Sequence, residues 1–202
     1  MISAQLAFER LQRGNRRFVA GKPRNAASRS RFTEMTREQT PFAVVLGCSD
    51  SRVPAEIVFD QWIGDLFVIR VAGNIVVPPL TGSVEFAASN FGTRLVVVLG
   101  HSGCGAVQAT IKQLQQPTGI ESPNLRSIVE HISPCVADLL DTDSPLDTDE
   151  LTARAVWANI GASVRRLRED SAILQQLVQD DGLLIVGAQC SLETGEVEFF
   201  DT

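Results

Sequence analysis

The chain has 202 residues, of which 44% are hydrophobic and 21% charged, and its formal net charge is −6 at pH 7. These values are typical of one soluble globular domain, which we expect over residues 1–202, and they exclude disordered and collagen-like chains. The negative charge argues against nucleic acid as a partner, because no overall positive field is available to neutralise phosphates.

The N-terminal segment predicts a helical arm and a linker over residues 1–40. Residues 3–19 have apolar side chains at a loose helical spacing, and a segment rich in Gly, Pro, Ser and Arg follows. We interpret Gly14 and Asn15 as residues that turn the arm, and the basic residues of this segment as a solvated surface. Because the arm has few apolar positions, a second subunit is one candidate for the surface on which it packs.

No targeting or membrane-spanning segment is evident. The N-terminal stretch contains Glu9 and several Arg, where a secretory signal needs an uninterrupted apolar run. No apolar run approaches the ~18 residues that a spanning helix needs. The sequence therefore predicts a cytoplasmic protein without a membrane partner.

Three short and nearly continuous apolar runs follow the arm, at 42–47, 66–71 and 95–100. Their content of Val, Ile and Leu is typical of strands that are buried on both faces. Residues 80–92 have apolar positions at helical spacing and end in a Gly. Strands that alternate with helices predict a parallel sheet.

The second half of the chain continues the alternation. It contains helical segments, a fourth apolar run and a hairpin-like return, at about 105–116, 123–140, 150–168, 183–190 and 195–200. We therefore predict an α/β core over residues 41–202. Its mostly parallel central sheet is flanked by helices and has a C-terminal antiparallel edge strand.

Chemically active side chains follow the first and third apolar runs. Cys48, Asp50 and Arg52 come after the first run, and His101 and Cys104 after the third. Functional sites of open parallel sheets lie at the carboxyl ends of the strands, so the two groups face each other if these strands are neighbours. Two thiolates and an imidazole suit zinc, and three protein ligands leave one position open for catalysis. Asp50 could fill that position or leave it to water.

The other histidine and cysteines lack such neighbours. Cys135 and Cys190 have no His or second Cys at ligand spacing, and we interpret them as core thiols. His131 lies on a predicted helix, and we interpret it as a surface or packing residue.

Two motifs, CSDSR at 48–52 and HSGCG at 101–105, resemble the two signatures of the β-class carbonic anhydrases. The segments at 14–21, 51–74 and 187–199 also look like segments of this family. The resemblance therefore covers most of the chain.

The resemblance implies a role for each residue of the two motifs. Cys48, His101 and Cys104 would hold Zn²⁺, whose bound hydroxide would hydrate CO2 reversibly to bicarbonate and a proton. Asp50 and Arg52 would form a dyad, in which Asp50 orients the hydroxide and Arg52 keeps Asp50 ionised and aimed. In a closed state of the site, Asp50 would become the fourth zinc ligand.

Further positions resemble the plant-like, type I subclass of this family. Gln39 stands where that subclass has a donor to a substrate oxygen, and Phe67 matches an apolar wall of its CO2 pocket. Gly105 could offer its backbone N–H to a bound anion. The chain departs from its relatives by having no Tyr, and by RVAGN at 70–74 where RN-x-AN is more usual.

Because the thinly apolar arm at 3–19 has little reason to stay on its own subunit, we expect it to pack across a twofold partner in a homodimer, and pairing of two dimers into a homotetramer stays open. Two other functions stay open at this point. A hydrolase of carbonyl sulfide or carbon disulfide would resemble this family in fold and zinc ligands. A non-catalytic module stabilised by zinc could use the same scaffold, although it would not require the pair of Asp50 and Arg52.

Overall fold

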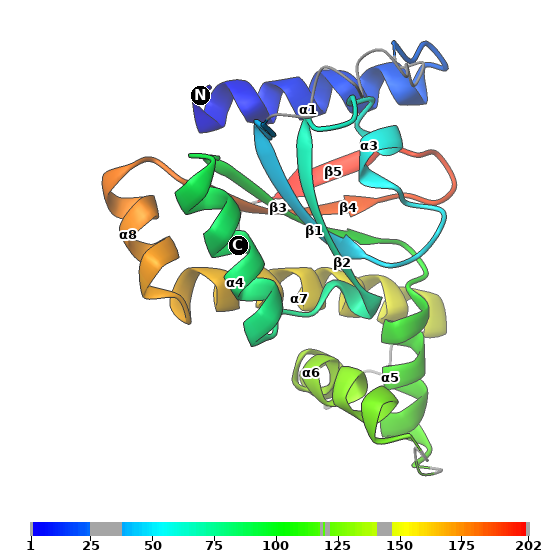
Figure 1. Ribbon diagram of the computed structural model, residues 1–202. Coiled ribbons are helices and arrows are strands. Elements are labelled where there is room, and N and C mark those ends of the chain that lie inside the picture. Colours follow the sequence, from blue (N-terminus) through cyan, green and yellow to red (C-terminus); the bar gives the residue numbers. More distant parts are fainter. Residues whose placement is uncertain (1, 25–37, 118, 120–121, 141–146, 201–202) are drawn as a thin grey trace.

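The structure is a computed structural model, and it describes residues 2–24, 38–117, 119, 122–140 and 147–200. The strands are β1 (Ala43–Cys48), β2 (Leu66–Val71), β3 (Leu95–His101), β4 (Leu184–Cys190) and β5 (Val197–Phe200). They form one sheet in the order β2-β1-β3-β4-β5, in which only β5 is antiparallel to its neighbour (Figure 1). The predicted α/β fold, with its antiparallel edge strand, is confirmed.

Helices cover both faces of the sheet. They are α1 (Ala4–Val19), α3 (Ala55–Val58), α4 (Pro78–Asn90), α5 (Gly105–Gln115), α6 (Pro123–Leu140), α7 (Thr148–Glu169) and α8 (Ala172–Asp180), with a 3-10 turn at Ala72–Asn74. One apolar core lies between the sheet and α4 to α8, and a second lies between the sheet and α1 with α3. None of the helices in the described ranges combines the length and apolar character needed to cross a bilayer.

Alternate side chains of the central strands enter the two cores. Val44 and Leu46 of β1 belong to the first core, and Ala43 and Val45 belong to the second. All residues of β1 and β3 are buried, as their apolar runs predict. The same prediction is wrong for β2, because this strand lies at the sheet edge and leaves Arg70 exposed.

Helix α7 has acidic residues at its start and basic residues at its end. The side chain of Asp147 caps its first turn by accepting a hydrogen bond from the backbone N–H of Glu150. Asp149 and Glu150 lie in the first turn, and Arg166 and Arg168 lie in the last. These charges complement the helix dipole and stabilise α7 at both ends.

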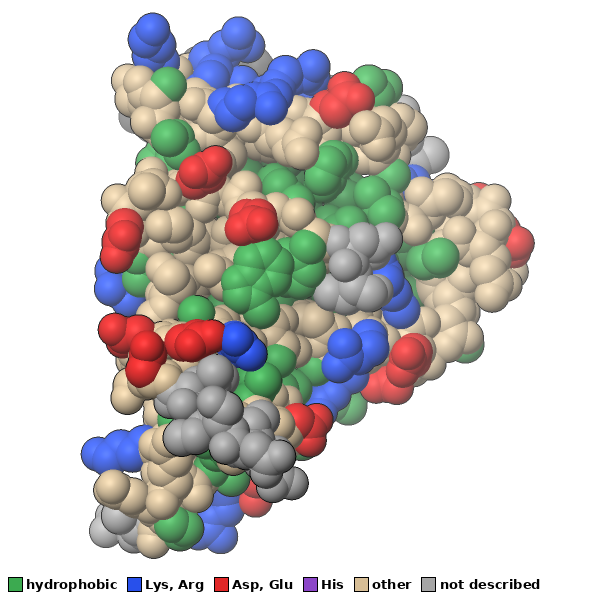
Figure 2. Space-filling model, turned by 180° about the vertical axis from the view of Figure 1, so that it is seen from behind, with side chains coloured by type: hydrophobic (Ala, Val, Ile, Leu, Met, Phe, Trp, Pro, Cys, Tyr) green, Lys and Arg blue, Asp and Glu red, His purple; other side chains and the backbone are tan. Residues whose placement is uncertain are grey.

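Helix α1 packs on the sheet of its own chain, which corrects the expectation of a second subunit under the arm. Ala7 and Leu11 are 1% and 0% exposed in the second core. Arg10 pairs with Asp65, and Arg17 pairs with the buried Asp60. The small apolar face is therefore sufficient, because two ion pairs beside it supplement the packing. Lys and Arg side chains also gather on the outer surface along α1 (Figure 2).

Gly14 and Asn15 lie inside α1 and do not turn the arm, so that interpretation is wrong. The side-chain amide of Asn15 donates hydrogen bonds to the carbonyl oxygens of Val58 and Gly195, and its oxygen accepts one from the backbone N–H of Val197. Asn15 thus joins α1 to the end of α3 and to the β4–β5 turn. The linker between residues 25 and 37 lies outside the described residues.

Replacement of Gly14 by Ala should destabilise the fold. A Cβ atom at this position would lie 1.7 Å from the carbonyl oxygen of Phe59, so α1 would have to move off the core. We expect a loss of at least about 1–3 kcal/mol in the free energy of unfolding, measured by urea denaturation.

Gly82→Ala in α4 is the matched control, because a Cβ at Gly82 would meet nothing within 4 Å. It should stabilise the protein by about 0.5–1 kcal/mol, since Gly in an exposed helix is less favourable than Ala. Equal stability of the Gly14→Ala variant and the wild type would contradict the close packing of α1.

Candidate metal centre

Strands β1 and β3 are parallel neighbours and end at the same edge of the sheet. Cys48 is the last residue of β1, and His101 is the last residue of β3. A short turn follows His101, with Gly103 at φ +63°, and leads to Cys104 at the N-cap of α5. The sheet order therefore brings the two motifs together, as the sequence predicts for neighbouring strands.

Three side chains converge at this edge in a geometry that suits a metal ion. The ligand atoms of Cys48, His101 and Cys104 all lie within 4.8 Å of one another, and the two Sγ atoms are 4.0 Å apart. The three residues are 8%, 0% and 1% exposed. No other cluster of this kind occurs among the residues that the structure describes.

His101 offers an unused nitrogen to this cluster. Its Nδ1 lies 3.0 Å from the carbonyl oxygen of Ser102, which fits an Nδ1–H donor and leaves a lone pair on Nε2. Nε2 is buried and has no hydrogen-bond partner within the described part of the chain. A buried acceptor without a donor is costly, and a cation held with two sulfur atoms would remove that cost. The donor set therefore fits a borderline-soft ion such as zinc.

Proximity also changes the protonation of these groups. A hydrogen bond from the Cys104 thiol lowers the pKa of Cys48 well below its usual range, and the same contact with burial raises the pKa of Cys104. Burial opposes charging of His101, but the neighbouring Cys48, Asp50 and the carbonyl oxygen of Ser102 together outweigh that effect, and the net pKa is raised. One thiolate therefore forms readily here, and a metal ion would favour loss of the second proton.

Asp50 and Arg52 form a bidentate pair beside the cluster. Nε and Nη2 of Arg52 donate to the two carboxylate oxygens of Asp50 at 2.9 and 2.7 Å, and the backbone N–H of Arg52 adds a bond of 3.0 Å. These bonds hold the pKa of Asp50 well below its usual range. Oδ2 of Asp50 lies 3.8 Å from Nε2 of His101, so an ionised carboxylate faces the cluster.

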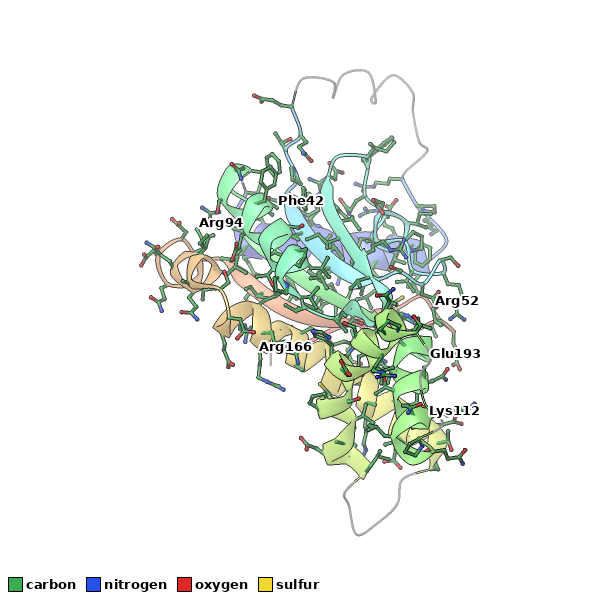
Figure 3. All side chains as sticks on the ribbon, turned by 60° about the horizontal axis from the view of Figure 1, so that its bottom comes forward. Phe42, Arg52, Arg94, Lys112, Arg166 and Glu193 are labelled. Atoms are coloured by element: carbon green, nitrogen blue, oxygen red, sulfur yellow. The ribbon has the colours of Figure 1, made fainter. Side chains whose placement is uncertain are left out.

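Arg70 anchors the loop that carries this pair. Its Nε donates to the carbonyl oxygen of Cys48 at 3.1 Å, and its Nη2 donates to that of Asp50 at 2.5 Å. The sequence pattern does not predict this role, because the contacts are with backbone atoms of another strand. In Figure 3, Arg52 lies where the strands end beside α5, and Phe42 lies toward the other end of the sheet.

The structure does not bring the predicted substrate residues together. Gly105 begins α5 directly after Cys104 and is exposed. Phe67 pairs in register with Val44, four residues before Cys48, and therefore lies ~13 Å from the end of the strand. Gln39 is exposed and precedes β1. Phe67 and Gln39 thus lie at the opposite end of the sheet from the metal cluster of their own chain.

Phe67 instead belongs to an aromatic surface cluster. Its ring centroid lies 6.3 Å from that of Phe86 and 6.0 Å from that of Phe91. Phe86 is 51% exposed, which is unusual for a large aromatic residue in contact with two others.

The remaining predicted positions lie as follows. Cys190 is buried, and burial raises its pKa to about 11, which is typical of a core thiol. Cys135 is only partly buried. His131 is partly buried on α6, with its Nδ1 2.7 Å from the carbonyl oxygen of Ser127, and it takes no part in the cluster.

Sequence reasoning missed a further contact with the cluster. The backbone N–H of Gly73 donates to Sγ of Cys48 at 3.4 Å. Asn159 of α7 donates to the carbonyl oxygen of Gly73 at 2.8 Å. The Gly-Asn pair at 73–74 is a turn signal that could have identified this segment, but nothing local to α7 points to Asn159.

Comparisons with known proteins agree with these observations. The model of the carbonic anhydrase family matches residues 43–197. The chain is 39% identical to carbonic anhydrase of Mycolicibacterium smegmatis, over 95% of this chain and 91% of that protein. It is 36% identical to carbonic anhydrase 2 of Mycobacterium tuberculosis, over 96% and 92% of the two chains.

Solved structures share the fold. The β-carbonic anhydrase CcaA superposes with a TM-score of 0.78 and 27% sequence identity, over 98% of this chain and 94% of that one. One of two tetrameric β-carbonic anhydrases from Sordaria macrospora superposes with a TM-score of 0.76 over 85% and 86% of the chains, and at 23% identity this likeness concerns the fold alone.

The ionised state of Asp50 should stabilise the protein in a pH-dependent way. Because pairing with Arg52 depresses the folded-state pKa of Asp50, its contribution is present above the unfolded value of ~3.9 and disappears as pH falls toward the folded value. The difference in unfolding free energy between the wild type and Asp50→Asn should therefore be constant from about pH 8 to 5 and decrease below about pH 4. A difference that does not change down to pH 3 would contradict this pairing.

Proposed function

This chain belongs to the β-class carbonic anhydrase family, and on that basis we propose that it hydrates CO2 reversibly to bicarbonate with one zinc ion. Cys48, His101 and Cys104 would hold the ion. The observation that carries the proposal is the convergence of these three ligand atoms beside an ionised Asp50. A module in which zinc is only structural would not need an ionised Asp50 beside the ligands.

The chain's own residues supply orientation and charge. When bound, zinc would lower the pKa of a water molecule toward neutrality and so make a nucleophile available. Asp50 would accept a hydrogen bond from that water and orient its lone pair toward CO2. Arg52 would keep Asp50 ionised and correctly aimed, and the bonds from Arg70 would keep the backbone of the loop in place.

We also propose that the active form is a homodimer or a homotetramer of two dimers. Phe67 lies far from the cluster of its own chain, within an aromatic group that is partly exposed. A second subunit placed over this end of the sheet would cover that group. It would also allow Phe67 and Gln39 to line the CO2 pocket of the neighbouring chain.

Protein purified without added metal should contain about one zinc ion per chain. Cys48→Ser and Cys104→Ser should lose most of it, because each removes one of three soft ligands. Cys190→Ser is the matched control, since Cys190 is equally buried but lies outside the cluster, and it should retain zinc. Metal content measured by plasma mass spectrometry tests this, and a metal-free sample with full activity would contradict the proposal.

Asp50→Ala and Arg52→Ala should retain zinc but lose about 10²–10³ in kcat/KM for CO2 hydration, because the pair orients the nucleophile and does not hold the ion. Stopped-flow kinetics measure the loss of CO2 hydration. The same measurement with carbonyl sulfide shows which of the two substrates the protein prefers. Glu193→Ala is the control, since Glu193 lies near Arg52 but makes no ion pair with it (Figure 3). Activity of either dyad variant equal to that of the control would contradict the assignment.

A further inference from the structure

We propose that Asn159 and Ser163 of α7 are positioning residues of the metal centre. They hold the turn at 72–74 so that the backbone N–H of Gly73 points at Sγ of Cys48. This inference rests on the proposed function in one respect, which is that Cys48 binds a metal ion.

The turn at 72–74 has a backbone conformation that needs support. Gly73 has φ +71°, and the next residue, Asn74, has φ +43°. Two successive residues in the left-handed region are uncommon, and for a non-glycine residue this conformation costs of order 1–3 kcal/mol. Asn tolerates the conformation better than most residues do, but it does not remove the cost. Such strain persists only where the surroundings fix it, and it is often associated with a functional site.

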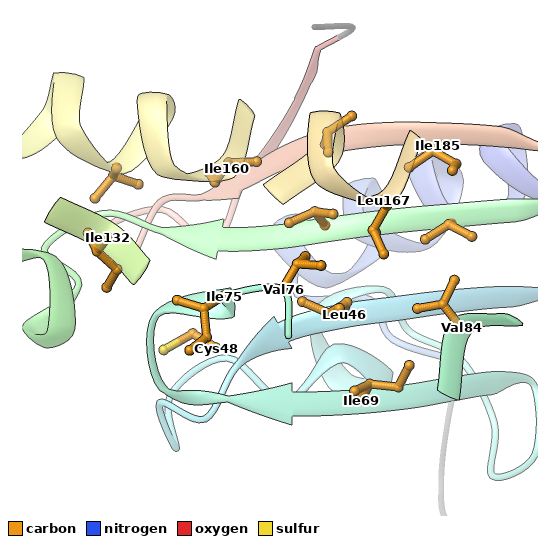
Figure 4. Packing of buried hydrophobic residues seen from close by; sticks show 14 of the residues in the cluster. Leu46, Cys48, Ile69, Ile75, Val76, Val84, Ile132, Ile160, Leu167 and Ile185 are labelled. Atoms are coloured by element: carbon orange, nitrogen blue, oxygen red, sulfur yellow. The ribbon is translucent and has the colours of Figure 1, made fainter. Parts of the chain in front are cut away.

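The turn is also tightly enclosed. A Cβ atom at Gly73 would lie 2.7 Å from Cδ1 of Ile132 and 3.1 Å from Cβ of Ala106, so α6 and α5 approach its backbone directly. Figure 4 shows Ile132 and Ile75 close to Cys48, on the side of the sheet covered by α7. The position therefore requires glycine, both for its conformation and for its space.

Two side chains from one face of α7 hold this turn. Nδ2 of Asn159 donates to the carbonyl oxygen of Gly73 at 2.8 Å, and Oγ of Ser163 donates to that of Asn74 at 3.0 Å. Residues four apart lie on the same side of a helix, so both bonds come from the same direction. Asn159 and Ser163 are 2% and 3% exposed. Burial of polar side chains is unfavourable without partners, and here the partners are successive carbonyl groups of the strained turn.

These bonds fix the two peptide groups that follow the Gly73 N–H, and so restrict the orientation of the peptide group that contacts the cluster. With the orientation of Gly73 set, its N–H lies 3.4 Å from Sγ of Cys48. An N–H donor draws negative charge away from a thiolate, so the sulfur becomes a weaker donor to its metal ion and the ion keeps more positive charge. Asn159 and Ser163 would thus tune the metal through the turn, without contact with the metal or the substrate.

Cobalt(II) substitution provides a direct measurement, because the sulfur-to-cobalt charge-transfer absorption reports the charge on the ligand thiolates. Asn159→Leu keeps the approximate shape of the side chain and removes the donor, and Ser163→Ala removes the hydroxyl. In both variants, weaker support of the Gly73 N–H should move the charge-transfer band to longer wavelength. With zinc bound, kcat/KM for CO2 should fall several-fold at unchanged zinc content.

Matched variants separate positioning from general loosening of α7. Ser163→Thr keeps the hydroxyl and should restore the wild-type band. Thr152→Ala removes another buried hydroxyl from α7. This hydroxyl donates to the carbonyl oxygen of Thr148 and not to the turn at 72–74, so the variant should leave the band unchanged. If Asn159→Leu does not fold, the Ser163→Ala and Ser163→Thr pair decides the question.

The outcomes distinguish this inference from the proposed function. A wild-type protein that binds neither cobalt nor zinc would overturn the proposed function. Normal metal binding with the wild-type band in Asn159→Leu and Ser163→Ala would overturn the positioning role alone. An equal band shift in Thr152→Ala would also overturn it, because the effect would then arise from α7 as a whole.

Discussion

The parallel pairing of β1 with β3 is the constraint on which the rest of the structure depends. It places the ends of two fully buried strands next to each other, and these ends carry Cys48 and His101. Apolar cores cover the two strands from both sides, so their ends can shift little without disturbing both cores. The metal cluster is therefore built at the ends of two tightly packed strands, which favours a fixed ligand geometry.

A rigid but buried edge creates a second requirement, because its polar groups need partners. Different elements meet this requirement separately: Ser102 accepts from His101, Arg70 donates to the loop after β1, and the turn at 72–74 donates to Cys48. Only Nε2 of His101 remains unpaired among the atoms of the cluster, within the described part of the chain. The ligand residues thus have hydrogen-bond partners in the surrounding protein, and the one unpaired atom faces the centre of the cluster. This arrangement is expected around a bound cation.

The sequence predicts the parts of this arrangement that depend on local pattern. Continuous apolar runs identify the strands, and chemically active residues after them identify the cluster, because side-chain type and strand end are both local properties. The docking of α1 depends on a hydrogen bond between residues 43 positions apart in the sequence, and the role of Asn159 on one between residues 86 positions apart. No local sequence pattern encodes such contacts. The distance of Gln39 from the cluster could have been derived, since nine residues of extended chain span ~30 Å. A match to a family motif gives the identity of a substrate residue but not the subunit whose site it serves.

The two ends of the sheet therefore have different requirements. The end with Cys48, His101 and Cys104 is complete within one chain, since its ligands and their supporting hydrogen bonds all come from the same subunit. The other end has an aromatic group that its own chain leaves partly exposed. Metal retention should then be a property of the single chain, whereas an apolar wall for CO2 would depend on assembly. Dilution to monomers should, on this reasoning, reduce activity before it reduces zinc content, because dissociation removes the wall and leaves the ligands in place.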